Sequence, residues 1–188
     1  MKIGEILYFS PNYKFWDLKW DDKENLIKAF NDRVQGFYIQ PTSQLNKEEK
    51  GFAAGILCIT TIDFLAKIDY KVRNQIKKWL KDNIDDFKKP DPDFLGNRSL
   101  ADRFYDEFRD GLIHEGRIKN GGQFSYDFQL LMKLQDGAMI INPDILLREI
   151  INYVDKFIIK INQDDATFYQ FRDYLKQEFQ REIELTRK

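Results

Sequence analysis

The chain contains a single histidine, His114, and the residues just before it could do acid–base chemistry with it. Histidine often donates or accepts protons near neutral pH, which makes it the commonest general acid or base in catalysis. In the stretch FRDGLIHEGRIKNGG, residues 108–122, Arg109 precedes the histidine by five residues and Asp110 precedes it by four. Arginine can hold an anion such as a phosphate with several N–H donors. Residues four apart share a helix face, so Asp110 can hold the imidazole in one orientation.

The segment that follows, Gly116 to Gly122, is predicted to be a loop with a local positive charge. It carries Arg117, Lys119 and Asn120 and ends in a glycine pair. Flexible glycines expose backbone N–H groups, and such groups contact phosphate oxygens together with basic side chains. The three residues are therefore candidates for binding a phosphate-bearing ligand. A solvated connection whose charges are incidental is the alternative.

Helical spacing predicts which side of the helix the histidine occupies. At about 100° per residue, one sector holds the apolar side chains that must pack on the protein, namely Ala101, Phe104, Tyr105, Phe108 and Leu112. His114 falls roughly opposite that sector, on a polar side that also holds Arg103, Glu107 and Asp110. This position favours an exposed histidine over a buried core histidine.

Arg109 and His114 are expected to point apart on an ideal helix, by about 140°. A site shared by both residues then needs help from the long arginine stem, from a loosened helix end near Gly116, or from a second subunit. Gly111, between them, destabilises a helix by about 1 kcal/mol relative to alanine. Either a backbone or a ligand approaches closely at Gly111, or the glycine is a neutral change at a tolerant site.

The rest of the chain is predicted to be mostly helical. Capping residues and apolar periodicity indicate helices over about 22–41, 46–69, 71–84, 99–115, 142–158 and 165–179. Asp136-Gly137 lies between two apolar runs, which is typical of a tight β-hairpin turn. We therefore expect an all-α fold, a bundle of about six helices with a small inserted β-hairpin. The length of 188 residues fits a single domain, 1–188.

The chain carries almost no net charge. The 30 basic and 31 acidic side chains nearly cancel, so any basic surface must be local. The only cysteine, Cys58, lies in an apolar stretch, which indicates a packing role and a reducing compartment. The amino-terminal residues lack the pattern of a signal peptide, and no apolar run approaches the ~18 residues that span a bilayer. A cytoplasmic protein without a membrane partner is expected.

Arg109, Asp110 and His114 have the form of an arginine, a polar residue, three further residues and a histidine, late in a helix. This pattern resembles the signature of the HEPN superfamily, helical-bundle proteins of prokaryotic defence and toxin systems and of RNA processing. The resemblance covers the motif specifically and the helical layout loosely, and the hairpin would be an elaboration of the fold. It implies a HEPN-like bundle in which Arg109, Asp110 and His114 are catalytic.

The resemblance also implies an activity, that of a metal-independent endoribonuclease that needs no cofactor and is often dimeric. Cleaving single-stranded RNA by its own 2′-OH requires deprotonation of that hydroxyl, protonation of the leaving oxygen and stabilisation of the phosphate charge. One histidine cannot readily be both base and acid, whereas a homodimer supplies two copies of His114 and of Arg109. Arg117, Lys119 and Asn120 would bind the RNA. A cytoplasmic nuclease needs restraint, so an antitoxin or another regulatory partner is expected.

Two other functions remain open. A HEPN-like module could bind RNA, a nucleotide or a protein without cutting. In a structural protein outside the family, Asp110 and His114 would form a surface pair that contributes about 0 to 1 kcal/mol. Metal-dependent catalysis is less attractive because one histidine gives no ligand cluster. The acidic pairs Asp91 with Asp93 and Asp164 with Asp165 look like loop acids and helix caps.

Overall fold

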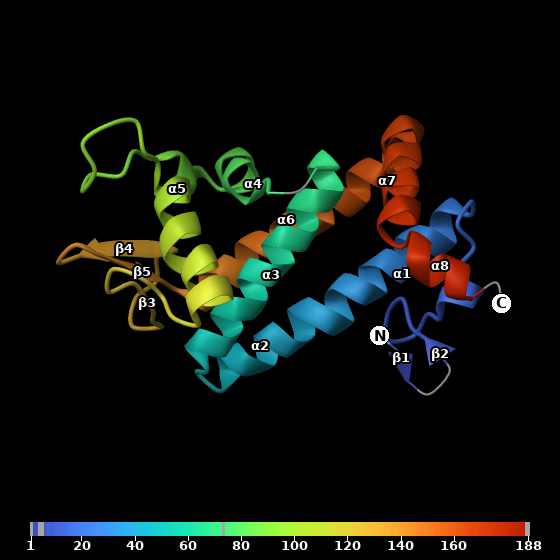
Figure 1. Cartoon of the computed structure of the whole chain (residues 1–188), viewed down its shortest axis with the longest axis horizontal. Helices are drawn as coiled ribbons and strands as arrows, with labels where there is room; N and C mark the ends of the chain where they lie inside the picture. The colour runs from blue at the N-terminus through green and yellow to red at the C-terminus, as the bar shows by residue number, and fades with distance from the viewer. Residues whose placement is uncertain (1, 4–5, 73, 187–188) are drawn as a thin grey trace. The chain divides into compact units, whose positions relative to one another are not determined.

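The computed structural model describes residues 2–3, 6–72 and 74–186, and these residues are mostly helical with a two-stranded and a three-stranded β-sheet (Figure 1). They group into two compact units, Met1–Pro41 with Asn152–Lys188, and Thr42–Ile151. The second unit carries all the candidate site residues. The mostly helical fold class with a small β element is confirmed, whereas the HEPN-like bundle and the single domain stay predictions.

The helix at the centre of the unit Thr42–Ile151 is α3 (Gly51–Tyr70). Its side chains are buried on several faces, including Ala54, Cys58, Ile59, Ile62, Leu65 and Ala66. α3 packs on α4 (Ile76–Asn83), and α4 packs on α5 (Leu100–Phe104) and on the 3-10 turn Asp85–Lys88. The predicted helix over 46–69 is thus central as expected, but Asn46 belongs to the preceding helix, α2 (Gln40–Lys47).

By length and composition alone, α3 could cross a membrane. The expectation that no apolar run approaches that length is therefore wrong. Half of its most apolar window is buried inside the protein, which is typical of a core helix.

A three-stranded sheet joins the same unit, in the order β3 (Gln123–Phe124), β5 (Ala138–Ile141), β4 (Met132–Gln135). The hairpin of β4 and β5 turns at Asp136 and Gly137, whose φ angles of 51° and 76° suit a type I′ turn, so the predicted hairpin is confirmed. β3 adds to β5 in parallel, and this pairing was not predicted. Phe124 of β3 packs against Gly55, where a Cβ would lie 2.0 Å from its ring.

The unit formed by Met1–Pro41 and Asn152–Lys188 is built on aromatic contacts. Phe30 lies 5.0 Å from Phe171 and 6.0 Å from Phe157 between ring centroids. Its elements are β1 (Lys2–Ile3), β2 (Ile6–Leu7), the 3-10 turn Phe15–Asp17, α1 (Lys23–Val34), the end of α6 (Pro143–Gln163), α7 (Asp165–Glu178) and α8 (Gln180–Leu185). Asp22 caps α1 and Asp164 caps α7, as expected of such residues.

The helix that begins at α1 does not end at Pro41, so that prediction is wrong. A π-helical segment, Gln35–Ile39, connects α1 to α2, and Pro41 lies inside α2. A proline ring normally clashes with the carbonyl four residues before it. Here that carbonyl belongs to Phe37, inside the π segment, where backbone hydrogen bonds join residues five apart rather than four.

The helix that carries the candidate site, called the site helix below, begins at Ser99 and ends at Gly116, as the sequence predicts. Ser99 and Asp102 form a reciprocal capping box, and Gly116 ends the helix in the left-handed conformation with a φ of 65°. Leu100–Phe104 is α-helical. Two π segments follow, Tyr105–Arg109 and Gly111–Glu115, and the single residue Asp110 between them is α-helical.

The capping residue Asp102 is held by charges from outside its helix. Its carboxylate lies 3.1 Å from Lys81 Nζ and 3.6 Å from Lys77 Nζ. Partial burial acts to raise the pKa of Asp102, but the hydrogen bonds from Ser99 and from the Lys81 ammonium outweigh it and hold the pKa well below its usual range. The start of the site helix is therefore stabilised by an ionised Asp102.

We expect Asp102→Asn to reduce the free energy of unfolding by about 1 kcal/mol at pH 7. Because the pKa of Asp102 is lower in the folded protein than in the unfolded chain, its contribution is complete above about pH 4 and is lost as the pH falls further. Urea unfolding between pH 2.5 and 7 should show the two proteins converging in acid. The control is Asp155→Asn, at an exposed position of α6. A difference that stays constant over this pH range would contradict the assignment.

Candidate functional site

Arg109 and His114 meet within one chain, with 3.4 Å between Arg109 Nη1 and His114 Nε2. The π segments explain this contact. Their backbone hydrogen bonds join residues five apart, as from the Asp110 N–H to the Tyr105 carbonyl and from the Gly116 N–H to the Gly111 carbonyl. Residues five apart then lie on the same side of the helix, so the separation expected on an ideal helix does not apply here. Of the ways expected to bring the two side chains together, a loosened helix near Gly116 is the one that the structure shows.

Asp110 completes the cluster. Its Oδ1 accepts a hydrogen bond from Arg109 Nη1 at 2.9 Å and lies 4.0 Å from His114 Nε2. The Arg109 guanidinium also lies over the ring of Tyr105, 5.3 Å from its centroid. Burial acts to lower the pKa of Arg109. The hydrogen bond to Asp110 and the charges of Tyr105 and Asp63 act more strongly in the opposite direction, so the pKa of Arg109 lies above its usual value. The cation is thus fixed beside the imidazole.

The cluster is open on its histidine side. The His114 side chain is 64% exposed, that of Asp110 is 32% exposed and that of Arg109 is 17% exposed. The predicted polar, exposed position of His114 is confirmed. A ligand can reach the imidazole directly, and the arginine lies behind it, where its remaining N–H donors can face an anion.

The loop Gly116–Gly122 presents less free charge than its sequence indicates. Arg117 Nη2 and Lys119 Nζ each lie 2.8 Å from a carboxylate oxygen of Glu115. The hydrogen bond from Lys119, with the charges of both cations, holds the pKa of Glu115 below its usual range. Surface pairs of this kind contribute only about 0 to 1 kcal/mol, so an incoming phosphate can replace Glu115.

Asn120, the third predicted loop residue, is turned toward the protein. Its Nδ2 donates to Glu107 Oε1 at 3.2 Å, and its φ of 52° is left-handed. In this conformation the side chain anchors the loop to the site helix. Of the three loop residues predicted to bind RNA, Asn120 is the least suited to that role, because its side-chain amide already has a protein partner.

The loop approaches the helix most closely at Gly111. A Cβ at this position would lie 2.4 Å from the Arg117 carbonyl oxygen. The Arg117 N–H donates to the Gly111 carbonyl at 3.2 Å, and the Lys119 N–H donates to the Glu107 carbonyl at 3.0 Å. Of the two explanations for Gly111, close approach of a backbone is the correct one.

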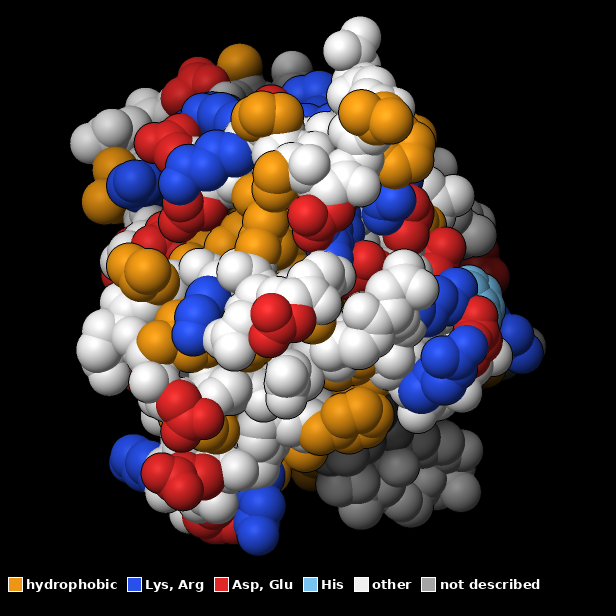
Figure 2. Space-filling view, turned by 90° about the vertical axis from the view of Figure 1, so that its left-hand side faces the viewer, with side chains coloured by type: hydrophobic (Ala, Val, Ile, Leu, Met, Phe, Trp, Pro, Cys, Tyr) orange, Lys and Arg blue, Asp and Glu red, His pale blue; other side chains and the backbone are white. Residues whose placement is uncertain are grey.

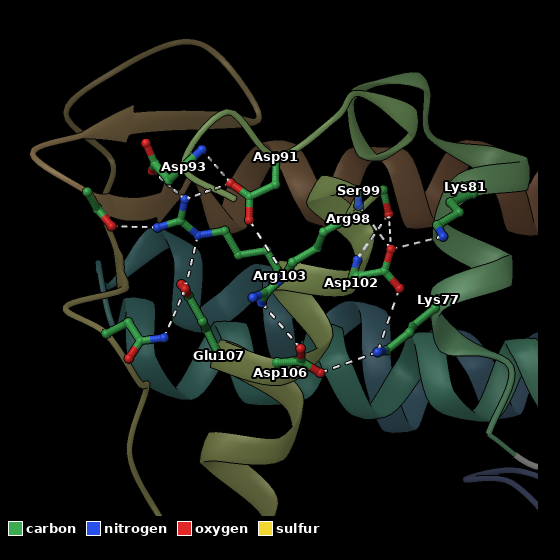
Figure 3. A network of polar contacts seen from close by, with 12 residues as sticks. Lys77, Lys81, Asp91, Asp93, Arg98, Ser99, Asp102, Arg103, Asp106 and Glu107 are labelled. Atoms are coloured by element: carbon green, nitrogen blue, oxygen red, sulfur yellow. Dashed lines mark hydrogen bonds and ion pairs between the residues drawn. The ribbon is translucent and has the colours of Figure 1, made fainter. Parts of the chain in front are cut away.

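Arg103 and Glu107 are buried, each 3% exposed, so their expected place on a solvated polar face is wrong. Figure 3 shows the Arg103 guanidinium surrounded by acceptors. Nε donates to Glu107 at 3.0 Å, and Nη1 donates to Asp93 at 2.7 Å and to Asp91 at 3.2 Å. Nη2 donates to the carbonyl of Gly137 in the hairpin turn. The loop before the helix and the hairpin after it cover this side of the helix.

Sequence reasoning missed this network, although part of it was visible. Arg103 and Glu107 have the four-residue spacing of a helical ion pair, and Asp91 and Asp93 precede them in a loop. The spacing alone does not distinguish an exposed pair from a buried one. Asp91 and Asp93 are loop acids as expected, and Asp91 is buried on Arg103.

Other chemistry-bearing groups lie elsewhere. Cys58 is buried, its Sγ lies 3.8 Å from the Pro143 carbonyl, and burial raises the pKa of its thiol strongly. The predicted packing role is thus confirmed. Among the residues that the structure describes, no group of three or more histidine, cysteine or acidic side chains is placed to hold a metal ion.

Charges on the surrounding surface are mixed. Figure 2 shows the side of the protein that carries α5 and the sheet, with Lys and Arg side chains interspersed among Asp and Glu. This agrees with the near-zero net charge of the chain. Attraction of an anionic ligand must therefore come from the few cations at the site rather than from a broad field.

Comparison with protein-family models gives no match, and neither does comparison with curated proteins or with solved structures. The HEPN resemblance is carried by Arg109, Asp110 and His114 together with the mostly helical architecture, and it stays a prediction.

We expect Gly111→Ala to reduce the free energy of unfolding by about 1 to 3 kcal/mol, although alanine is the better helix former by about 1 kcal/mol. The added methyl group must push the loop backbone away. Urea unfolding measures the loss, and hydrogen exchange should show faster exchange of the Lys119 amide. The control is Ile113→Ala, whose side chain is 50% exposed two residues later. Equal or greater stability of Gly111→Ala, with the Lys119 amide still protected, would contradict the close approach.

Proposed function

We propose that this protein is a metal-independent endoribonuclease that cleaves single-stranded RNA through attack by the 2′-OH. The observation that carries the proposal is the contact between Arg109 and His114, 3.4 Å between Nη1 and Nε2, with the imidazole open to solvent. An imidazole that can move a proton stands beside a fixed cation that can hold a phosphate oxygen. The HEPN resemblance supports the same chemistry.

Each residue of the cluster has a distinct task in this proposal. His114 removes the proton from the 2′-OH or delivers one to the leaving 5′ oxygen. Arg109 binds the non-bridging phosphate oxygens, whose negative charge increases in the transition state. Asp110 holds the guanidinium in place. Arg117 and Lys119 exchange Glu115 for neighbouring phosphates of the strand.

A homodimer would complete the site. The reaction needs an acid and a base, and each chain has one histidine. Ile113, next to His114, is 50% exposed, so an apolar side chain lies beside the site where a second copy would cover it. We propose that two site helices face each other across a twofold axis, so that one His114 acts as base and the other as acid.

A non-catalytic RNA-binding module is the second candidate. It is favoured by the pairing of each cation with an acid, Arg109 with Asp110 and both Arg117 and Lys119 with Glu115. Such a site can exchange its carboxylates for phosphates without any proton transfer. In that case the protein binds RNA without cleaving it, and the RNA stays intact whether or not His114 is present.

We expect the purified protein to cleave single-stranded RNA in EDTA and to leave 2′,3′-cyclic phosphate ends. His114→Ala and Arg109→Ala should each lower the rate about 100-fold or more, which is the usual contribution of a general acid–base or charge-stabilising group. Arg148→Ala is the matched control, because Arg148 is also ion-paired but lies on α6 with 64% of its side chain exposed. RNA binding without cleavage would favour the second candidate, and unchanged rates in both variants would reject the site.

The shared site has a test of its own. We expect inactive His114→Ala chains, mixed in excess with the wild-type protein, to suppress activity per wild-type chain, because mixed dimers lack one histidine. The same excess of Arg148→Ala chains should have no such effect. Unaffected activity in the presence of the His114→Ala chains, under conditions where subunits exchange, would show that one chain acts alone.

A further inference from the structure

A pocket of about 320 Å³ opens at the end of the site helix, between that helix, the following loop and the start of α3. This volume is within the range of small-ligand sites. Its lining combines aromatic rings, a cation, an amide and bare backbone, from Phe52, Phe124, Arg117, Gln123, Gly116 and Gly122.

The two aromatic walls differ in exposure. Phe52 is 49% exposed at the start of α3, so one face of its ring is available. Phe124 is fixed from behind, because its ring packs on Gly55 and lies 5.2 Å from the ring of Phe108. An exposed ring beside a fixed one forms a platform on which a flat ligand can stack.

The polar groups of the pocket suit a nucleotide. Arg117 is a cation with a 66% exposed side chain, and it can contact a phosphate or stack on a base. Gln123 is exposed and offers one acceptor and two donors to the edge of a base. Gly116 has open space where a side chain would lie, so the helix end does not obstruct the pocket.

The pocket is close to the proposed reacting groups. Gly116, which lines it, follows His114 by two residues, and two peptide units limit the separation of their Cα atoms to about 7.6 Å. The pocket and the cluster of Arg109, Asp110 and His114 therefore lie at the same end of the site helix.

We propose that this pocket binds the base of the nucleotide next to the phosphodiester held at Arg109 and His114. The base stacks on Phe52, its edge meets Gln123, and Arg117 contacts the adjoining phosphate. The assignment rests on the proposed function for the identity of the strand, but base binding itself needs no cleavage. It gives the site a preference among RNA sequences, because Gln123 meets different groups on each base.

The test is binding of single ribonucleoside monophosphates, followed by NMR chemical shifts and calorimetry at millimolar ligand. We expect at least one nucleotide to bind more tightly than inorganic phosphate or ribose 5-phosphate. Phe52→Ala should weaken this binding about 5- to 100-fold, since a base stacked on an aromatic ring is lost. Phe52→Trp should retain it, and Gln123→Ala should reduce the differences among the four bases.

Phe94→Ala is the matched control, because Phe94 has the same 49% exposure as Phe52 and does not line the pocket. It should leave binding unchanged. Equal affinity for inorganic phosphate and nucleotide, no nucleotide binding at all, or unchanged affinity in a folded Phe52→Ala protein would each overturn the proposal. If base binding depends on Phe52 but the protein never cleaves RNA, the pocket assignment is supported and the proposed nuclease activity is contradicted. If cleavage depends on His114 but Phe52→Ala does not change nucleotide affinity, the nuclease activity is supported and the pocket assignment is contradicted.

Discussion

The buried guanidinium of Arg103 is the constraint on which the surroundings of the candidate site depend. A buried cation loses several kcal/mol of hydration, and the loss is offset only when most of its N–H groups have acceptors. Here the acceptors come from separate parts of the chain, the loop at Asp91 and Asp93, the hairpin turn at Gly137 and the site helix at Glu107. Satisfying one charge therefore holds the loop and the hairpin turn against the helix that carries Arg109 and His114.

The same network reaches the basic loop. Glu107 accepts from Arg103 and from Asn120, so one carboxylate ties the hairpin side of the helix to the loop Gly116–Gly122. Gly111 then lets the loop backbone lie directly on the helix. The loop cations are paired with Glu115, the residue after His114, and this pairing keeps the charge of the surface balanced.

Helix geometry decides what the site can do. On an α-helix Arg109 and His114 would be about 140° apart, and only a partner subunit or a distorted helix could bring them together. The two π segments supply that distortion within the chain. The dimer in the proposed function is therefore not needed to bring arginine and histidine together. Its role there is to provide a second proton-transfer group.

Local features of the sequence determined much of the fold. Ser99 with Asp102, Asp22 and Gly116 mark helix ends, and Asp136-Gly137 marks the hairpin, because each of these signals acts through its own few residues. Apolar periodicity likewise identified the central helix and the exposed side of His114. The tertiary structure alone decided the burial of Arg103, the addition of β3 and the meeting of Arg109 with His114. These depend on which distant segments cover the helix and on a one-residue change in its hydrogen-bond register, and neither is encoded in the spacing of neighbouring residues.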